Sequence, residues 1–433
     1  MPYAIDLFCG AGGMSEGLLQ AGFQILFSSD INEDVQKTYM NRHKQLGYEQ
    51  GINTYFHRCD VRELTGDFIK ECISNLEIFK GKEVPEIDAI FGGPPCQGFS
   101  RAGLRKKDDP RNLLFKEYLR VISEIQPNYV VMENVVGFLD MQFEGFEGIS
   151  GNVYEDGSVT PDILKAELAE LGYIANMQVL DASNYGVPQR RNRVIFMAYK
   201  HDKKKPEFPK PFTESKKVTL DDALSDVIRR NRDDNYQYTL FQKESLSGRT
   251  PNIKGNAIPL KGNYLNNELS THSKIIVERF SLYREGEDSA ALKRRVKEFG
   301  VSLDGKDELI SLCADCLGIE EDKVVELYKK NVTEKMVDVL LTKKNMRRRL
   351  ERNNVSPTVV TLPDDYISPY EDRTFSVREL ARLQSFDDSF EFLGKRTTGG
   401  PRRKVEVPQY SQVGNAVPPL LAKAVAKEII KVI

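Results

Sequence analysis

Short apolar runs alternate with longer amphipathic stretches between residues 3 and 199. The runs are rich in β-branched residues and are typical of strands, whereas the longer stretches repeat their apolar positions with helical spacing. They predict strands at 3–8, 24–29, 88–91, 129–132 and 193–197, and helices at 15–21, 35–42, 65–78, 113–124 and 163–171. Strands separated by helices indicate an α/β fold with a doubly wound, mainly parallel sheet, whose ligands bind at the carboxyl ends of the strands.

The pattern changes after residue 199. Lysine and proline are concentrated at 203–211, Asn- and Gly-rich turns follow at 255–267, and a charged section with helical spacing runs from 289 to 344. The α/β texture resumes near Asp372, and residues 420–430 form an amphipathic helical pattern. We therefore expect a first domain at 1–199, an inserted domain at 200–370, and a C-terminal segment at 371–433 that returns to the first domain.

Composition is ordinary for a globular protein, because 40% of the 433 residues are hydrophobic and 29% are charged. The apolar runs fall far short of the ~18 residues that a membrane-spanning helix needs, and no basic leader precedes the first predicted strand. Six cysteines are few for this length and indicate free thiols in a reducing compartment. We therefore expect a cytoplasmic protein that is neither membrane-bound nor secreted.

The net charge is only −2, from 62 Lys and Arg against 64 Asp and Glu, so the total charge does not point to a polyanionic partner. Basic residues are nevertheless concentrated at 101–111, 200–217, 343–352 and 402–404. Each cluster alone is typical of a solvated surface. Together they are compatible with a nucleic-acid cleft on a nearly neutral protein.

A glycine-rich turn follows the first predicted strand, where residues 6–13 are Asp-Leu-Phe-Cys-Gly-Ala-Gly-Gly. Glycines at this point let the backbone approach a ligand closely. The dinucleotide fingerprint would place a third glycine at Ser15, so NAD is disfavoured. Asp30 ends the next strand, where α/β folds commonly hold ribose hydroxyls. The combination predicts a nucleoside-bearing cofactor, and a plain strand–helix turn is the alternative for this motif taken alone.

Residues 92–100 are Gly-Gly-Pro-Pro-Cys-Gln-Gly-Phe-Ser and place Cys96 on a loop at the same sheet edge. The prolines restrict the backbone and the glycines leave room for a large group to approach. A cysteine attacks as its thiolate, which the basic residues between 101 and 107 would favour. The alternative, a small buried thiol, is unusual among Gly and Pro. This loop therefore predicts a nucleophile.

Two more polar motifs adjoin predicted strands. Glu133 and Asn134 follow the apolar run 129–132, although a helix-capping role would also explain either residue. Residues 189–193 are Gln-Arg-Arg-Asn-Arg and point alternate arginines to one side of the next strand. Arginine binds phosphate or carboxylate through two parallel hydrogen bonds.

In this order, the motifs resemble those of the DNA (cytosine-5) methyltransferases of bacterial restriction-modification systems. The matching segments are 6–13, 93–100, 133–135, 189–193, 378–384 and 414–419, which together span nearly the whole chain. The resemblance implies the Rossmann-like fold of methyltransferases that use S-adenosylmethionine. It also implies that the insert is a target recognition domain for double-stranded DNA, with phosphate contacts from 200–217 and 343–352.

The resemblance implies methyl transfer from S-adenosylmethionine to C5 of a cytosine flipped out of a specific double-stranded sequence. Cys96 would add to C6 of the base, Glu133 would bind its N3 and amino edge, and Arg191 and Arg193 would orient the base and Glu133. The implied cofactor-binding residues are Phe8, Gly10, Gly12, Gly13, Asp30, Ile31, Asp60, Val61, Leu114, Asn415 and Ala416. Position 30 is Asp where the family more often has Glu.

The same resemblance implies a protective methylase, associated with the nucleoid and accompanied by a cognate restriction endonuclease. We expect the protein to act as a monomer and to need no metal, since the Cys313 and Cys316 pair has zinc-like spacing but no second pair.

Three other classes of protein are alternatives to this interpretation. A zinc deaminase is excluded, because no histidine is followed two positions later by Glu and Cys96 has no cysteine three positions on. An RNA cytosine-5 methyltransferase on the same scaffold is disfavoured by the long insert. A non-enzymatic DNA-binding relative is disfavoured because Cys96, Glu133, Arg191 and Arg193 are all present.

Overall fold

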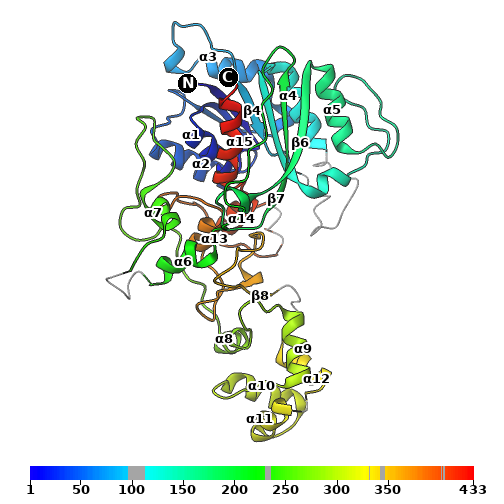
Figure 1. Ribbon diagram of the computed structural model, residues 1–433, viewed down its shortest axis with the longest axis vertical. Helices are drawn as coiled ribbons and strands as arrows, with labels where there is room; N and C mark the ends of the chain where they lie inside the picture. The colour runs from blue at the N-terminus through cyan, green and yellow to red at the C-terminus, as the bar shows by residue number, and fades with distance from the viewer. Residues whose placement is uncertain (96–112, 230–235, 331, 342–346, 401, 403–404) are drawn as a thin grey trace.

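The computed structural model describes residues 1–95, 113–229, 236–330, 332–341, 347–400, 402 and 405–433. Among them, seven strands form one sheet in the order β3-β2-β1-β4-β5-β7-β6 (Figure 1). The strands are β1 (Tyr3–Leu7), β2 (Gln24–Asp30), β3 (Tyr55–Arg58), β4 (Ala89–Gly92), β5 (Tyr129–Val135), β6 (Tyr173–Asp181) and β7 (Asn192–Lys200). The pairs from β3 to β5 are parallel, and β7 is antiparallel to both β5 and β6. The predicted doubly wound α/β fold is confirmed.

The five strands predicted from the sequence are confirmed, whereas β3 and β6 were not predicted. β6 lies at the edge of the sheet and exposes Ile174, Met177 and Val179, so it lacks the continuous apolar run of a buried strand. β3 is short and includes the polar His57 and Arg58. Both strands therefore have weak sequence patterns.

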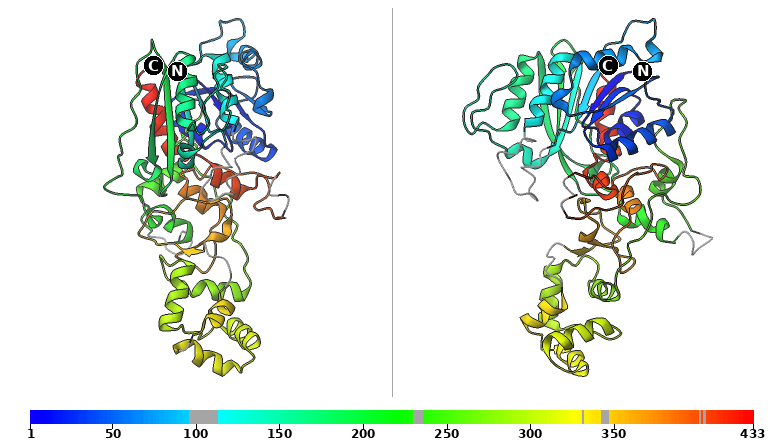
Figure 2. Two further views of the ribbon diagram at one scale, coloured as in Figure 1. Left: turned by 90° about the vertical axis from the view of Figure 1, so that its right-hand side faces the viewer. Right: turned by 180° about the vertical axis from the view of Figure 1, so that it is seen from behind.

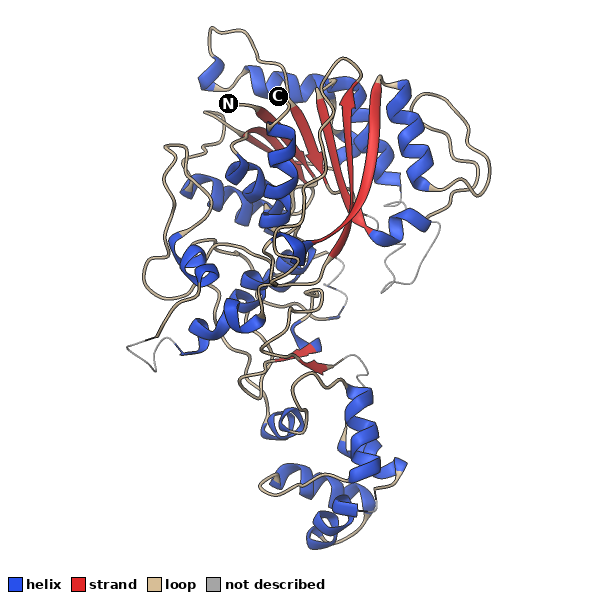
Figure 3. Cartoon of the chain, in the orientation of Figure 1, coloured by secondary structure: helices blue, strands red, loops and turns tan. Residues whose placement is uncertain are grey.

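Helices cover both faces of the sheet, as Figures 1 and 3 show. The helices around the sheet are α1 (Gly13–Ala21), α2 (Glu33–Gln45), α3 (Gly66–Ser74), α4 (Leu114–Ile125), α5 (Thr160–Glu170) and α15 (Pro419–Ile430). Short 3-10 turns lie at η1 (Val61–Glu63), η2 (Glu77–Phe79), η4 (Val136–Asp140), η5 (Ala182–Tyr185) and η6 (Pro363–Asp365). α3, α4 and α5 pack on the face that carries Ile5 and Leu7, and α1 and α15 pack on the face that carries Ala4. This alternation follows from the two-residue period of a strand.

A second group of helices lies beyond the carboxyl ends of the strands. It contains α6 (Leu220–Arg229), α7 (Leu240–Ser247), α13 (Val377–Leu383) and α14 (Gln409–Asn415), with the two-stranded sheet of β8 (Arg348–Arg349) and β9 (Tyr366–Ile367) nearby. These helices share one hydrophobic core that includes Leu220, Phe241 and Leu380. Residues from before and after position 370 therefore pack together.

Five further helices project away from the sheet, as all three views show (Figures 1 and 2). They are α8 (Lys274–Ser281), α9 (Ser289–Phe299), α10 (Asp307–Leu317), α11 (Glu321–Lys330) and α12 (Glu334–Leu340). They enclose a core of their own, centred on residues such as Leu292 and Val324. In the described part of the chain, no helix combines the length and the apolar character needed to cross a membrane.

The C-terminal helix α15 packs closely against α1, and Gly17 lies in this contact. A Cβ at Gly17 would lie 2.5 Å from the Cβ of Ala422 and 2.6 Å from the backbone nitrogen of Lys423. Since both atoms belong to a packed helix rather than a flexible side chain, they cannot yield easily.

We expect Gly17→Ala to lower the free energy of unfolding by about 2 kcal/mol, because overpacking outweighs the better helix propensity of alanine. Urea denaturation of both proteins measures the difference. Gly399→Ala is the control, since a Cβ there would meet nothing within 4 Å. Equal stabilities for Gly17→Ala and the wild type would contradict this account of the α1–α15 contact.

Candidate active site

Three parallel strands end side by side and place the predicted motifs at one edge of the sheet. Leu7 of β1 pairs with Gly92 of β4, and Gly92 pairs with Met132 of β5. The glycine turn, the segment that leads to Cys96, and Glu133 therefore leave the sheet at the same edge. Cys96 itself lies outside the described residues.

Glu133 forms an ion pair with Arg193, with 2.7 Å between Oε1 and Nε, and both side chains are nearly buried. The antiparallel register places Val135 opposite Arg193, so the arginine lies diagonally across from Glu133. Glu133 also lies against the loop, because a Cβ at Gly93 would be 3.2 Å from its Oε2. The carboxylate is thus fixed beside the chain that continues to Cys96.

Asn134 fixes the same loop through a hydrogen bond from its Nδ2 to the carbonyl of Pro94, at 3.0 Å. The amide is buried, so this bond is protected from water. Asn134 appears in the sequence motif, but its role there remained open between capping and function. The structure assigns it to the loop.

Arg191 lies behind the Glu133–Arg193 pair and is buried. Its Nη2 donates to the carbonyl of Gly414 at 3.0 Å and its Nη1 donates to that of Val359 at 3.5 Å, while Nε has no hydrogen-bond partner among the described residues. Burial and the charge of Arg193 lower the pKa of the Arg191 guanidinium. Arg191 therefore joins the sheet to two segments distant in sequence.

Gln189 makes a similar connection that sequence analysis did not identify. Its Oε1 accepts from the backbone N–H of Val359 at 2.7 Å, and its Nε2 donates to Oε1 of Gln384 at 2.8 Å. The side chain is fully buried. Its motif was visible in the sequence, but nothing in the sequence indicated which partners it would have.

The glycine turn adopts unusual backbone angles. Phe8, Gly10 and Gly12 have φ of 56°, 54° and 98°, and a positive φ is uncommon for a residue such as Phe8. The N–H of Gly10 donates to Oδ2 of Asp30 at 3.1 Å. A Cβ at Gly10 would meet no atom within 4 Å, so the turn borders open space beside a carboxylate.

The ends of β2 and β3 add the second side of this space. Asp30 pairs with Arg58 across the two strands, which brings Asp60 to the same edge. Burial raises the pKa of Asp30, and a hydrogen bond from Arg62 lowers that of Asp60. Ile31 is 63% exposed next to Asp30. An exposed apolar side chain beside two carboxylates suits a nucleoside.

The remaining predicted cofactor residues differ in their surroundings. Val61 is only 7% exposed and packs in the core below α3 and α4. Gly13 lies against Ala416 and the carbonyl of Val417, where a Cβ would clash. Leu114 begins α4 and packs in the same core cluster as Phe8, while Asn415 ends α14 and is exposed.

Asp6 lies beneath the glycine turn and was not predicted as a site residue. It is buried, accepts a 2.5 Å hydrogen bond from the hydroxyl of Ser15 at Oδ2, and has no partner for Oδ1 among the described residues. Burial raises its pKa to about 7, and the charge of Asp30 adds to this effect. The folded chain therefore binds this proton more tightly than the unfolded chain.

The stability contributed by Asp6 should fall as the pH rises from about 4 to about 7, because the folded state then holds more protons than the unfolded state. We expect Asp6→Asn to gain stability relative to the wild type across that interval, measured by urea denaturation at about pH 5 and about pH 8. Asp67→Asn, on the exposed first turn of α3, is the control and should follow the wild type. A difference that does not change with pH would contradict the raised pKa.

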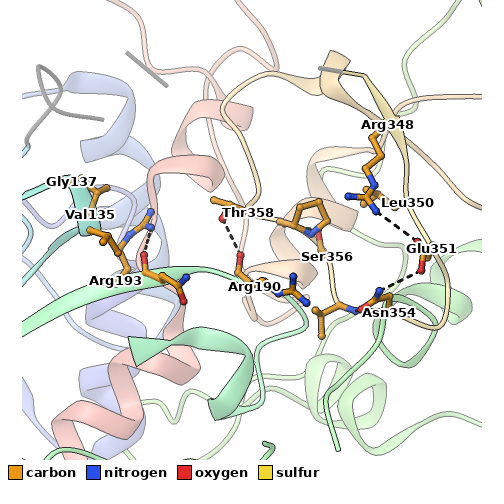
Figure 4. Close-up of a pocket in the computed structure, with 14 residues that line it drawn as sticks. Val135, Gly137, Arg190, Arg193, Arg348, Leu350, Glu351, Asn354, Ser356 and Thr358 are labelled. Atoms are coloured by element: carbon orange, nitrogen blue, oxygen red, sulfur yellow. Dashed lines mark hydrogen bonds and ion pairs between the residues drawn. The ribbon is translucent and has the colours of Figure 1, made fainter. Parts of the chain in front are cut away.

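A cavity of about 460 Å³ lies beside Arg193. Figure 4 shows Val135 and Gly137 on one side and the segment from Arg348 to Thr358 on the other. The cavity therefore lies between this edge of the sheet and the segment 348–358.

Comparisons with known proteins cover nearly the full length of the chain. A family model described as C-5 cytosine-specific DNA methylase matches residues 3–431. The type II methyltransferase M.DdeI of Desulfomicrobium norvegicum is 31% identical, over 98% of this chain and 88% of its own. M.AgeI of Thalassovita gelatinovora is 31% identical over 98% of both chains.

A solved structure from E. coli, described as a candidate DNA modification methyltransferase encoded within a prophage, has the same fold. Its TM-score is 0.63 at 24% identity, over 100% of this chain and 99% of that chain. The family model and the two relatives confirm the resemblance seen in the sequence motifs, and this chain belongs to the C-5 cytosine-specific DNA methylase family.

Proposed function

We propose that the protein transfers a methyl group from S-adenosylmethionine to C5 of a cytosine flipped out of a specific double-stranded DNA sequence. The observation that supports this most directly is the Glu133–Arg193 ion pair, held against the segment that leads to Cys96. The type II methyltransferase relatives support a protective role alongside a cognate restriction endonuclease.

The reaction has to overcome the poor nucleophilicity of cytosine C5. Addition of the Cys96 thiolate to C6 makes C5 enamine-like, and C5 then takes up the methyl group. Loss of the C5 proton expels the thiolate and restores the aromatic ring. The prolines before Cys96 and the bond from Asn134 to Pro94 would hold the start of this loop in place.

Glu133 would bind the N3 and amino edge of the flipped base as charge develops in the ring. Arg193 holds the carboxylate through Nε and so restricts its rotation. Arg191 would act as a positioning residue, since its hydrogen bonds fix the strand to Val359 and Gly414 rather than reaching Glu133.

S-adenosylmethionine would supply an electrophilic methyl group when bound. The open space at Gly10, the carboxylates of Asp30 and Asp60, and the exposed Ile31 fit its adenosine part. Phe8, Gly12, Gly13, Val61, Leu114, Asn415 and Ala416 complete the proposed set. The carboxylates would accept hydrogen bonds from ribose and adenine, while Ile31 would cover the ring.

We further infer a division into a catalytic domain at 1–199, a DNA-reading domain at 200–370 and a returning segment at 371–433. The separate core of α8–α12 is consistent with an insert that folds around its own apolar residues. We propose that the protein acts as a monomer in the cytoplasm, in association with the nucleoid.

Bisulfite sequencing of DNA from cells that express the protein tests the function and finds the target sequence together. We expect methylated cytosines in one short sequence context. Cells expressing Cys96→Ala should show none, because the variant lacks the thiol that activates C5. The purified variant should bind S-adenosylmethionine within a few fold of the wild type. Methylation by Cys96→Ala would contradict the nucleophile assignment, and a covalent adduct of 5-fluorocytosine DNA on another cysteine would do the same.

Glu133→Gln should lower the rate of methyl transfer at saturating DNA by roughly 10²- to 10⁴-fold, the usual range for a positioned acid or base. Binding of the target duplex should change far less, because Gln keeps the shape of the side chain. Single-turnover kinetics with labelled cofactor measure the rate. Glu155→Gln, at an exposed position, is the control. A rate for Glu133→Gln equal to that of this control would contradict the role of Glu133.

A further inference from the structure

The cavity beside Arg193 is lined by basic, polar and apolar groups from two parts of the chain (Figure 4). The sheet side contributes residues at the end of β5 and the start of β7, and the other side is the segment 348–358. The lining residues are Val135, Val136, Gly137, Arg190, Asn192, Arg193, Arg348, Leu350, Glu351, Asn354, Val355, Ser356, Pro357 and Thr358. Three of them are arginines, and Glu351 is the single carboxylate among these fourteen.

The three guanidinium groups are not equally neutralised. Arg193 is paired with Glu133 at 2.7 Å. Arg348 has only a loose contact, since its Nη2 lies 3.6 Å from Oε1 of Glu351 and its Nε has no hydrogen-bond partner among the described residues. The guanidinium of Arg190 is exposed and has no ion pair within the described part of the chain. Arg190 and Arg348 are therefore available to an anion.

The backbone that carries Arg190 is held in place on the cavity wall. Its N–H donates to the carbonyl of Ser356 at 2.7 Å, and its carbonyl accepts from Oγ1 of Thr358 at 2.9 Å. These two hydrogen bonds join the sheet side of the cavity to the segment 348–358 at the backbone of Arg190. A fixed backbone lowers the entropy lost when a side chain binds a ligand.

Glu351 is also held, since Nδ2 of Asn354 donates to its Oε2 at 3.3 Å and its side chain packs against Gly286. Its carboxylate would repel an anion that enters the cavity. When an anion binds, Arg348 must therefore either break its contact with Glu351 or contact Glu351 and the anion together.

We propose that this cavity binds one phosphodiester group of the DNA strand next to the target cytosine, between Arg190 and Arg348, and that Arg348 exchanges its contact with Glu351 for the phosphate. The surplus of guanidinium groups over carboxylates disfavours a metal cation and also a ligand without charge. This inference rests on the proposed function, because Arg193 belongs both to the cavity wall and to the pair that would hold the base.

Equilibrium binding to a short duplex that carries the target found by bisulfite sequencing tests the proposal. Arg190→Ala and Arg348→Ala should each raise Kd roughly tenfold, and each should reduce the slope of log K against log salt concentration by about 0.9, the effect of one lost phosphate contact. Lys80→Ala is the charge-matched control, because Lys80 is exposed, pairs with Glu77, lies outside the basic clusters and does not line the cavity. Glu351→Gln should lower Kd, since it removes the competing charge.

A neutral methylphosphonate at each position around the target then locates the group. At one position, the methylphosphonate should weaken binding by the wild type as much as Arg348→Ala weakens binding to unmodified DNA. The same methylphosphonate should not weaken binding by Arg348→Ala any further. Arginine variants that bind with the Kd and salt slope of Lys80→Ala would overturn the proposal, and so would Glu351→Gln binding as weakly as Arg348→Ala. If bisulfite sequencing shows that the wild type methylates DNA, the proposed function stays intact even when this proposal is overturned. A wild type that modifies no DNA would overturn the function itself.

Discussion

The ion pair between Glu133 and Arg193 is the contact on which the geometry of the proposed catalytic edge depends. It requires that β7 run antiparallel to β5, since only then does the start of β7 lie beside the end of β5. A parallel β7 would begin at the opposite edge of the sheet. Nearly buried charges are stable only when paired, so this contact also favours the observed register over a shifted one.

The same edge is connected to distant parts of the chain by side chains that lie inside the protein. The side chain of Gln189 accepts a hydrogen bond from the backbone N–H of Val359, and that of Arg191 donates to the backbone carbonyls of Val359 and Gly414. Because these hydrogen bonds are buried, breaking one leaves an unsatisfied donor or acceptor. The start of β7 therefore positions the segment after residue 350, and with it one wall of the cavity.

Buried ion pairs make a comparable connection beside the glycine turn. Arg42 of α2 donates to both carboxylate oxygens of Glu16, at 2.8 and 2.9 Å, and lies 3.6 Å from Asp387. Asp387 also pairs with Arg249, at 3.2 Å. Two helices beside the glycine turn are thereby joined to segments that come much later in the sequence. Such a network fixes relative positions more precisely than apolar packing alone, because its hydrogen bonds are directional.

Local sequence patterns were sufficient to predict the strands β1, β2, β4, β5 and β7 and the motifs at their ends. Periodicity reports burial, and parallel strands separated by helices must bring their carboxyl ends together. The sequence by itself therefore determined that the glycine turn, Glu133 and the segment leading to Cys96 share one edge.

Only the tertiary structure decided what surrounds that edge. Nothing local indicated that Arg190 would face Arg348 across a cavity or that Asn134 would hold Pro94. The same is true of Asp6, which is buried with one oxygen that has no partner in the described part of the chain. Arg190 and Arg348 are separated by most of the insert, so their meeting depends on the path of that insert. The physical reason is that periodicity records which side of an element is buried, whereas contacts between distant residues depend on how the whole chain packs.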